Sequence, residues 1–432
     1  MKAFVRRCIA RMFEHQVRRL VARHKPIVVA VAGSVGKTST KTAIATVLSQ
    51  KYTTLVHQGN YNSELGLPLS VFELSVPRSL INPFAWGWRL YQSELMLRSY
   101  PYRALVLELG TDHPGEIPRY TRYLRPDVAV ISAVTPEHME NFPGGLDDVA
   151  AEELALVKSA TRVLASYDDI LPVHRHRYVD PHPNHVYYGT HADADYIVRL
   201  EASSPIEGSK ISLKAPAKSF HKFDLASFGL PSAKSALAAY AVGDMLELSQ
   251  SQLKAGLAAI RPVAGRMNPL AGVGGATIID DTYNSSPEAA IAALEALGLA
   301  AVSGKRIAIL GSMNELGAKS ADYHRQVGRA AAGVDWLITI GEMASDHLGP
   351  AALEAGLDPT RWKAASSPYA AGEFVRLMLS ERDVVLVKGS QNGVFAEEAT
   401  KLLLADPNDA ARLVRQSTGW ERIKRSQFPD ES

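Results

Sequence analysis

"PIVVAVAGSVGKTSTKTAIATVLSQ", residues 26–50, places a strand, a turn and a helix in the order typical of phosphate-binding proteins. The β-branched run up to Ala32 predicts a buried strand, and the helix formers after Lys37 predict a helix with one apolar face. The turn is a short form of the phosphate-binding loop, because Val31 stands where the full-length loop has a glycine. The stretch therefore predicts a nucleotide site at the start of a helix.

Each part of this loop has a chemical task. Glycines let backbone N–H groups turn toward phosphate oxygens, and the positive end of the helix dipole attracts the same charge. Lys37 supplies a positive charge for the β- and γ-phosphates, and the Thr38 hydroxyl is suited to Mg²⁺. The residues expected to contact ATP are Gly33, Ser34, Val35, Gly36, Lys37, Thr38 and Ser39.

Two series of strands surround and follow the loop. Short apolar runs at 103–110, 127–134 and 161–166 alternate with helical stretches, which predicts a parallel sheet covered on both faces. A second series begins at about residue 276 and alternates with Ala-rich helices. The predicted fold class is α/β: a central P-loop-type ATPase domain with a parallel sheet, followed by a Rossmann-like C-terminal domain.

Changes in composition suggest where these parts begin and end. We expect a basic helix at 1–26, the central domain at 27–262, the C-terminal domain at 263–418 and a polar, partly ordered tail at 419–432. Residues 167–228 interrupt the central pattern, since they are rich in Pro and His and contain two strands of antiparallel character. An insertion or a small separate sheet is expected there.

Composition argues against several classes of protein. The 432 residues carry a net charge of +2, which does not favour polyelectrolyte binding to nucleic acid. Cys8 is the one cysteine, so an intramolecular disulfide is excluded and a cysteine-based zinc site is not expected. No uncharged apolar run reaches the roughly 18 residues that a membrane-spanning helix needs.

Two segments rich in basic or aromatic residues allow more than one interpretation. Residues 2–25 carry eight Lys or Arg and one acid, Glu14, around an apolar stripe. Such a helix either lies on an anionic membrane surface or packs on the protein with a solvated basic face. Residues 76–102 include Trp86 and Trp88 beside arginines, which suits a membrane interface, a partner groove or helices that cover the domain.

Two polar residues follow predicted strands of the central domain. Glu108 ends the strand at 103–110, and His138 comes soon after the strand at 127–134. The carboxyl ends of parallel strands meet at the crevice where ligands bind. Glu108 is therefore a Mg²⁺ ligand or, in the alternative, a surface acid that ends a strand. We expect His138 at the same crevice.

Eight motifs occur in the order and approximate spacing of the Mur ligases: "GSVGKTSTK", "GNYNSELGLP", "ELGTDHPGEI", "TPEHMENF", "GRMNPL", "IDDTYNSSP", "GSMNELG" and "VKGSQN". The chain resembles this family from about residue 27 to 417, and most of all its MurF branch. The resemblance implies that ATP phosphorylates a carboxylate of a peptidoglycan precursor peptide. D-Ala-D-Ala or a similar amine would then attack the acyl phosphate, so that an amide, ADP and phosphate form.

The resemblance also implies roles for individual residues. Thr38 and Glu108 would hold one Mg²⁺, and His138 would help to hold a second. Arg266 would reach the γ-phosphate from the C-terminal domain, so the site would assemble on domain closure. The other implied contacts are Asp280 or Asp281, Tyr283 and Asn284 with the nucleoside, Asn60 and Asn62 with the acceptor, and Asn314, Glu315, Lys388, Gly389 and Ser390 with the amine.

One implied catalytic position departs from the family. Members carry a carbamylated lysine after the His motif, and Glu153 occupies that position here. A carbamate and a carboxylate are both anionic ligands with two oxygens, so Glu153 is expected to hold the second metal directly. The alternative is a solvated helix acid. Lys37, His138, Glu153 and Arg266 form the expected catalytic set.

A further departure concerns the front of the chain. MurF-like ligases have a domain there for the UDP-sugar, and about 26 residues are too few to build one. Another surface would then read UDP, or the acceptor is not a UDP precursor. We expect a cytoplasmic monomer, with membrane contact at the inner face through 1–25 and 76–102 as one option. Alternatives are a folylpolyglutamate- or cyanophycin-type acceptor, or a nucleotide-binding scaffold without turnover.

Overall fold

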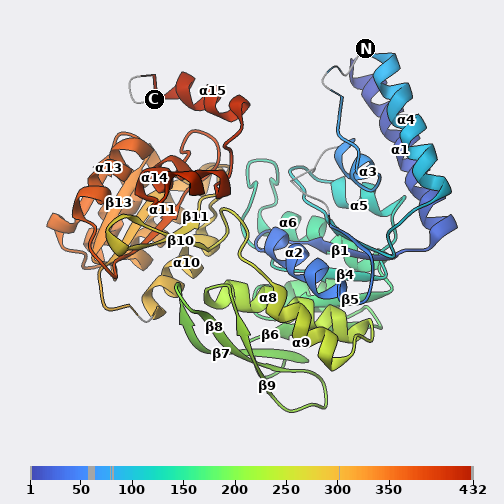
Figure 1. The fold of residues 1–432 in the computed structure, drawn as a ribbon, viewed down its shortest axis with the longest axis horizontal. Helices are drawn as coiled ribbons and strands as arrows, with labels where there is room; N and C mark the ends of the chain where they lie inside the picture. Colours follow the sequence, from blue (N-terminus) through green and yellow to red (C-terminus); the bar gives the residue numbers. More distant parts are fainter. Residues whose placement is uncertain (1, 57–63, 78, 80–81, 301, 430–432) are drawn as a thin grey trace.

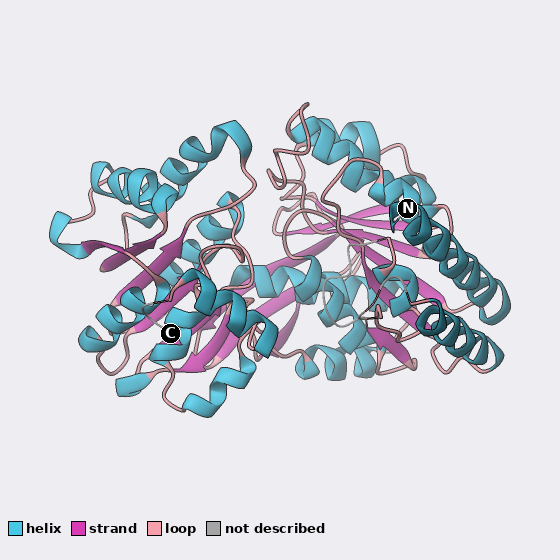
Figure 2. Ribbon diagram, turned by 90° about the horizontal axis from the view of Figure 1, so that it is seen from above, coloured by secondary structure: helices cyan, strands magenta, loops and turns pink. Residues whose placement is uncertain are grey.

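Two β-sheets form the two halves of the chain, and helices cover each of them (Figure 1). The computed structural model describes residues 2–56, 64–77, 79, 82–300 and 302–429. Seen from above, the strands of both sheets lie between layers of helices (Figure 2). The predicted α/β class with two successive sheet domains is confirmed.

The central sheet has the order β2-β3-β1-β4-β5-β6-β7-β8-β9 within the described residues. Pairing is parallel from β2 to β7, whereas β7–β8 and β8–β9 are antiparallel. The strands are β1 Ile27–Ala32, β2 Thr54–Val56, β3 Ala104–Glu108, β4 Val128–Ile131, β5 Arg162–Ser166, β6 His185–Gly189, β7 Tyr196–Ser204, β8 Gly208–Lys214 and β9 His221–Leu225.

The phosphate loop follows the middle of the parallel part of this sheet. β1 pairs with β3 on one side and β4 on the other, and all its residues except Ile27 are buried. A run of Val and Ala suits this position, because helices cover both faces of the strand. The carboxyl ends of these three strands meet at one edge, where they place the loop and Glu108 side by side.

Residues 167–228 extend the central sheet, so the expectation of a separate small sheet is wrong. The two expected antiparallel strands are present as β7 and β8, but β6 joins them in parallel fashion to β5. The pattern of a single strand shows which face is apolar, but the sheet edge that the strand joins is decided by tertiary contacts.

The C-terminal sheet has the order β10-β11-β15-β12-β13-β14 and is parallel except for β10. Its strands are β10 Asn268–Ala271, β11 Thr277–Asp281, β12 Arg306–Gly311, β13 Trp336–Ile340, β14 Trp362–Ala365 and β15 Val384–Lys388. The crossed-over order is typical of doubly wound folds, as the alternating strands and helices predict.

The helices of the described residues are α1 Lys2–His24, α2 Lys37–Leu48, α3 Gly66–Ser70, α4 Pro83–Arg98, α5 Glu116–Thr121, α6 Leu146–Glu153, α7 Pro172–His174, α8 Gly229–Met245, α9 Gln250–Ala259, α10 Pro287–Leu299, α11 Ser320–Ala331, α12 Gly349–Glu354, α13 Pro368–Met378, α14 Glu397–Leu403 and α15 Thr418–Gln427. Short 3-10 or π turns occupy Leu154–Ser159, Arg175–Val179, Val273–Gly275, Gly317–Lys319, Ala344–Leu348, Pro359–Arg361 and Pro407–Arg412.

Helix α1 packs on the protein through its apolar face. Phe13, Val17 and Leu20 are buried, and the Phe13 ring centroid lies 6.2 Å from that of Trp86 in α4. Both figures show α1 and α4 side by side at the outer edge of the central half. The apolar face of α1 is therefore packed on the protein, while contact of its basic face with a membrane stays a prediction. No helix in the described part of the chain has the length and apolar character needed to cross a bilayer.

Residues 419–427 of the expected polar tail lie in a docked helix, α15. Lys424 is buried, and its Nζ lies 2.5 Å from Glu398 Oε1 and 2.9 Å from Glu397 Oε1. Although its sequence is polar, α15 docks on the protein because Lys424 pairs with the buried carboxylates of Glu397 and Glu398 in α14. Such pairing cannot be recognised from composition.

Candidate active site

The phosphate loop is fixed against the end of β4. Ser34 N–H donates to the Ala133 carbonyl at 2.9 Å, and Ser132 Oγ donates to the Val35 carbonyl at 2.7 Å. Gly33 has a φ of 127°, and a Cβ at this position would lie 2.5 Å from Ser132 Oγ. The loop therefore needs glycine at this position both for its backbone conformation and for space.

Lys37 begins α2 and lies among carboxylates. Its Nζ is 3.3 Å from Glu137 Oε2 and donates to the Ser34 carbonyl at 3.1 Å. Burial lowers the pKa of Lys37, but the charges of Glu137, Glu153 and Glu108 outweigh burial and raise this pKa. The ammonium therefore stays charged at the place where such loops hold the β- and γ-phosphates.

Glu108 connects the end of β3 to the first turns of α2. It accepts a hydrogen bond from Thr38 Oγ1 at 3.1 Å, and its Oε2 lies 3.0 Å from Lys41 Nζ. Burial raises its pKa, but Lys41 and Lys37 outweigh burial and hold the pKa below its usual value. Glu108 is buried, so the alternative of a surface acid is wrong.

His138 joins the two halves of the molecule. Its Nδ1 lies 2.6 Å from Glu315 Oε2 of the C-terminal half, and its Nε2 lies 3.3 Å from Asp112 Oδ1. The Met139 N–H also donates to the Glu315 carbonyl at 2.9 Å. Burial lowers the pKa of His138, but the surrounding carboxylates outweigh burial and raise it. The two sheets are thus held together at the site itself.

Arg266 approaches from the segment before β10. Its guanidinium lies 4.3 Å from the Tyr283 ring centroid, and its Nε is buried without a hydrogen-bond partner in the described residues. Its charge contributes to the lowered pKa of Glu108 across the domain boundary. A buried cationic donor without a partner is costly unless a ligand satisfies it. Arg266 is therefore suited to bind an anionic ligand.

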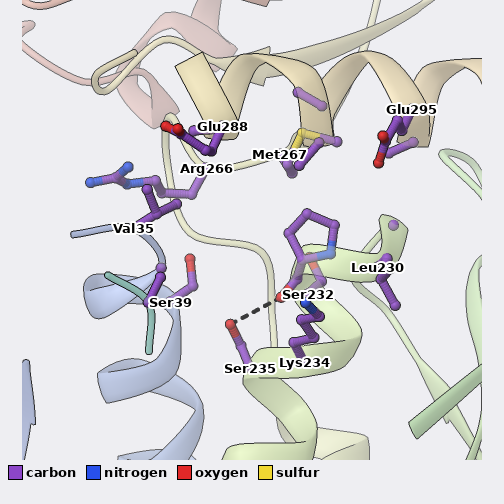
Figure 3. Close-up of a pocket in the computed structure, with 18 of the residues that line it drawn as sticks. Val35, Ser39, Leu230, Ser232, Lys234, Ser235, Arg266, Met267, Glu288 and Glu295 are labelled. Atoms are coloured by element: carbon purple, nitrogen blue, oxygen red, sulfur yellow. Dashed lines mark hydrogen bonds between the residues drawn. The ribbon is translucent and has the colours of Figure 1, made fainter. Parts of the chain in front are cut away.

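Two cavities share Arg266 and the phosphate loop. The larger, of about 500 Å³, has a polar lining from both halves: Ser34, Val35, Gly36, Lys37, Glu108, Thr111, Asp112, Glu137, His138, Arg266, Tyr283, Asn284, Ser285, Ser286, Ala289, Asn314, Glu315, Gln391, Asn392 and Trp420. The smaller, of about 380 Å³, is more apolar and lies between α2, α8 and α10. Figure 3 shows Arg266 and Glu288 across this smaller cavity from Ser39 and Lys234.

Most predicted contacts lie at these cavities. The larger cavity holds Tyr283, Asn284, Asn314 and Glu315 together with the loop, and the smaller one holds Ser39, Asp281 and Lys388. Thr38 donates to the lining residue Glu108, and the Gly33 N–H donates to Glu153 behind the phosphate loop. Asn60 and Asn62 lie outside the described residues.

Several predicted contacts lie deeper than expected. Asp280 is fully buried and accepts hydrogen bonds from Gly265 N–H at 2.9 Å and Thr282 Oγ1 at 2.5 Å, so it closes a turn and does not face either cavity. Lys388 is buried 2.7 Å from Asp281 Oδ2. Behind the larger cavity, Ser390 Oγ accepts the Asn314 N–H at 3.0 Å.

Gly389 also lies behind the lining, where a Cβ would meet Val394 Cγ1 at 2.8 Å. Ser390 thus supports the loop that presents Asn314, whereas Lys388 donates to Asp281 and to the Asn284 carbonyl. None of the three residues of this motif is in the lining of the larger cavity. Lys388 ends the fully buried strand β15 and the other two residues follow it, so their polar groups hold neighbouring turns. Contact of these residues with the incoming amine stays a prediction.

Sequence analysis assigned no role to four residues of the site. Glu137 is adjacent to His138, and Lys41 follows Lys37 by one helical turn, so helical spacing was an available signal for Lys41. Asp112 lies near the end of β3. Trp420, on α15, had no such signal, because only the docking of that helix brings its ring to the larger cavity.

Both halves of the chain match models of one protein family. The Mur ligase middle domain matches residues 31–79 and 90–243, and the glutamate ligase domain of Mur ligases matches residues 265–391. The chain belongs to the Mur ligase family. The matched ranges include the phosphate loop, Glu108, His138, Arg266 and Glu315.

Known Mur ligases support this assignment over most of the chain. The UDP-N-acetylmuramoyl-tripeptide–D-alanyl-D-alanine ligase of Escherichia coli is 28% identical over 386 residues, which cover 86% of this chain and 75% of the relative. The crystal structure of MurF ligase from Thermotoga maritima in complex with ADP has a TM-score of 0.73 at 24% identity, covering 91% and 83% of the two chains.

The folylpolyglutamate synthase of Mycobacterium tuberculosis complexed with ADP has a TM-score of 0.62 at 15% identity, covering 94% of this chain and 100% of that one. At these identities, both structural likenesses show a shared fold.

The donor set of this Mur ligase fits a magnesium ion. Among the described residues, no group of three or more His, Cys, Asp or Glu is placed to hold a metal. Mg²⁺ does not need one, since one or two carboxylates commonly hold it together with phosphates and water. Thr38 and Glu108 supply a hydroxyl and a carboxylate beside the loop. Beyond its ion pair with Lys41, Glu108 Oε2 has no hydrogen-bond partner in the described part of the chain.

Glu153 lies at the base of the phosphate loop. It is buried, and its Oε2 accepts the Gly33 N–H at 2.8 Å, so the alternative of a solvated helix acid is wrong. Burial raises the pKa of Glu153 to about 7. Glu152 beside it has a different task, because its carboxylate accepts the N–H groups of Gly115 and Ile117. That Glu153 takes the part of the carbamylated lysine stays a prediction.

Replacement of Glu153 by Gln tests that prediction. The amide keeps an acceptor for Gly33 N–H but removes the negative charge, so we expect turnover to fall and the Mg²⁺ requirement to rise, each by about 10–100-fold. Steady-state rates across a Mg²⁺ titration measure both effects. Glu152→Gln is the matched control, and we expect it to lower the Tm and to leave the Mg²⁺ requirement unchanged. Unchanged turnover and metal dependence in Glu153→Gln and Glu153→Ala would show that the prediction is wrong.

Proposed function

We propose that this Mur ligase joins a carboxylate to an amine at the expense of ATP, through an acyl phosphate. One observation carries the proposal: Lys37 and Glu108 of the central half and Arg266 of the C-terminal half line the same cavity. Transfer of a γ-phosphoryl group concentrates negative charge, and a cavity with cations supplied from both halves is suited to neutralise that charge.

The first step would activate the acceptor carboxylate. A carboxylate oxygen attacks the γ-phosphorus of ATP, the bond to the β,γ-bridging oxygen breaks, and ADP leaves. Lys37 and Arg266 would stabilise the charge on the transferring group from opposite sides. Mg²⁺ held by Thr38 and Glu108 would supply further charge neutralisation at the phosphates.

The second step would form the amide. The neutral amine attacks the activated carbonyl carbon, phosphate leaves with the bonding electron pair, and the ammonium loses a proton. Asn314, Glu315 and Asn392 stand on the C-terminal side of the larger cavity, where an incoming amine would lie. Closure of the two halves through His138 and Glu315 would exclude water, which otherwise hydrolyses an acyl phosphate.

The proposed substrates follow the sequence relatives. We propose a muramoyl-peptide precursor of peptidoglycan as the acceptor and D-Ala-D-Ala or a similar amine as the donor, because the Escherichia coli relative is a UDP-N-acetylmuramoyl-tripeptide–D-alanyl-D-alanine ligase. The enzyme would act as a monomer in the cytoplasm, at the inner face of the membrane.

Phosphate release from ATP tests this function. Release should require both a muramoyl-tripeptide acceptor and D-Ala-D-Ala, and mass spectrometry should find the amide product. Phosphate release that depends on glutamate and a folate acceptor would show that these compounds, and not the proposed ones, are the substrates. The absence of amine-dependent release with every acceptor would leave a nucleotide-binding scaffold and overturn the proposal.

Trp420 is proposed as a wall of the amine subsite. Its ring packs edge-on against Phe395 with centroids 6.2 Å apart, and it lines the larger cavity with Asn314 and Asn392. Gln427 of the same helix donates to the Gly393 carbonyl at 2.5 Å, which ties α15 to the loop after β15. An apolar wall here would favour amines with small apolar side chains.

Replacing Trp420 with Ala should raise the KM for D-Ala-D-Ala about tenfold or more, because the apolar wall is lost. The KM for ATP and the kcat should stay within about twofold, since Trp420 stands among C-terminal residues of the cavity and supplies no charge to the phosphates. Arg422→Ala, exposed on the same helix, is the matched control. An unchanged amine KM, or an equal rise in the KM for ATP, would contradict this role.

A further inference from the structure

An exposed aromatic stripe runs along α4. Phe84, Trp88, Tyr91 and Leu95 are 87%, 57%, 53% and 43% exposed. Their spacing of four, three and four residues places them on one face of the helix. The opposite face, with Trp86, is buried against the protein. An ordinary surface helix keeps large apolar side chains on its buried face, so this stripe needs a partner.

Helix α1 places positive charge beside the stripe. Among its described side chains the only acid is Glu14, which pairs with Arg119 at 2.8 Å. Arg7, Arg11, Arg18 and Arg23 are exposed, and no described carboxylate lies within 4.0 Å of them. Arg7, Arg11 and Arg18, spaced four and seven residues apart, share one face of α1, and we call these three arginines the basic row.

The two helices present the stripe and the basic row together. α1 and α4 run in parallel, because Phe13 meets Trp86 and Arg19 pairs with Glu94 further along both helices, at 2.6 Å. Phe13 and Trp86 both pack on Leu65 and Leu69, at the start of and within α3. Since both helices bury their inner faces on the same element, their outer faces point away from the protein.

We propose that α1 and α4 form a docking surface for an anionic lipid membrane. Aromatic side chains partition into the boundary between headgroups and acyl chains, and arginines bind anionic headgroups. The combination of an exposed aromatic stripe with an unpaired basic row matches this surface in both chemistry and charge. A water-soluble acidic partner would satisfy the arginines but not the stripe.

The location of this surface is compatible with catalysis. In both views α1 and α4 lie on the side of the central half that faces away from the C-terminal half. Contact with a membrane would therefore leave the shared cavity and the closure of the two halves unobstructed. The family model omits residues 1–30 and 80–89, so most of the docking surface is outside the matched ligase domains. The docking surface rests on the proposed function only for its purpose, which would be to bring the enzyme to a precursor held at the membrane.

Vesicle co-sedimentation of the full chain tests the proposal. The probes are vesicles of phosphatidylcholine alone and vesicles with roughly a third of phosphatidylglycerol. We expect at least tenfold stronger binding to the anionic vesicles, weakened by salt. Phe84→Ser with Trp88→Ser should reduce binding at least tenfold, and so should Arg11→Gln with Arg18→Gln. Brominated lipid should quench tryptophan fluorescence in the wild type, and much less in Trp88→Phe.

Matched controls come from the C-terminal half. Leu377→Ser removes a side chain that is 90% exposed, and Arg329→Gln with Arg376→Gln removes two exposed charges; both should bind vesicles like the wild type. Failure of the wild type to bind anionic vesicles would overturn the proposal, as would equal losses in the controls. Self-association that is lost in Phe84→Ser with Trp88→Ser, without vesicle binding, would assign the stripe to a second copy.

The outcome is separable from that of the proposed ligase function. Ligase activity with soluble substrates should be unchanged in all these variants, because none lines the shared cavity. Vesicle binding without ligase activity would support the docking surface and contradict the proposed function, and the reverse result would do the opposite.

Discussion

Replacing Lys37 with Met is expected to lower amine-dependent ATP turnover by about 10³-fold or more. The ammonium is the loop's own cation at the phosphates, and its pKa is raised by three surrounding carboxylates. Without it, Glu137 and Glu153 would face an ATP phosphate with no intervening positive charge. Repulsion would then weaken nucleotide binding as well as phosphoryl transfer.

Steady-state phosphate release and thermal protection by ADP measure these two effects. Lys51→Met is the matched control, because Lys51 lies just after the end of the same helix and donates to the Glu247 carbonyl on the surface. Lys37→Arg keeps the positive charge. A folded but inactive Lys37→Arg would therefore show that turnover requires the position of the ammonium as well as its charge. Turnover of Lys37→Met within tenfold of the wild type would contradict the proposed phosphate site.

Replacing Arg266 with Ala is expected to lower kcat by about 10²–10³-fold. Its Nε is buried without a partner among the described residues, which indicates a donor reserved for a ligand. Because Arg266 comes from the segment before β10 while the phosphate loop follows β1, it reaches the ligand only when the two halves are together. Its loss should therefore affect the transfer step more than the binding of ADP to the loop.

Arg261→Ala is the matched control, since Arg261 is exposed a few residues earlier in the same connecting segment. In Arg266→Ala, the affinity for ADP, measured by thermal protection, should fall by less than about threefold, while kcat falls as stated above. Arg266→Lys should recover only part of the rate, because one ammonium cannot replace a planar guanidinium against a phosphate. A kcat within twofold of the wild type would exclude a role of Arg266 in the transfer.

The predictable parts of the site lie close to strand ends. The loop, Glu108 and His138 each follow a strand whose apolar run is plain in the sequence, and the carboxyl ends of parallel strands converge. Arg266, Glu315 and Asn314 were identified through motifs of the family and lie at the predicted cavity. Asp280, Gly389 and Ser390 belong to such motifs as well, yet they support neighbouring turns. A motif cannot distinguish a residue that touches a ligand from one that holds its neighbour.

By itself, the sequence determined the α/β class, the phosphate loop and the two successive sheets, because hydrophobic period and glycine placement act locally along the chain. Tertiary structure alone decided three things: that β6 to β9 extend the central sheet, that Glu153 lies buried under Gly33, and that α15 brings Trp420 to the cavity. Each depends on pairing or burial between segments far apart in the chain. The free energy of such contacts depends on the residues that pack against each segment, and the local sequence does not identify those residues.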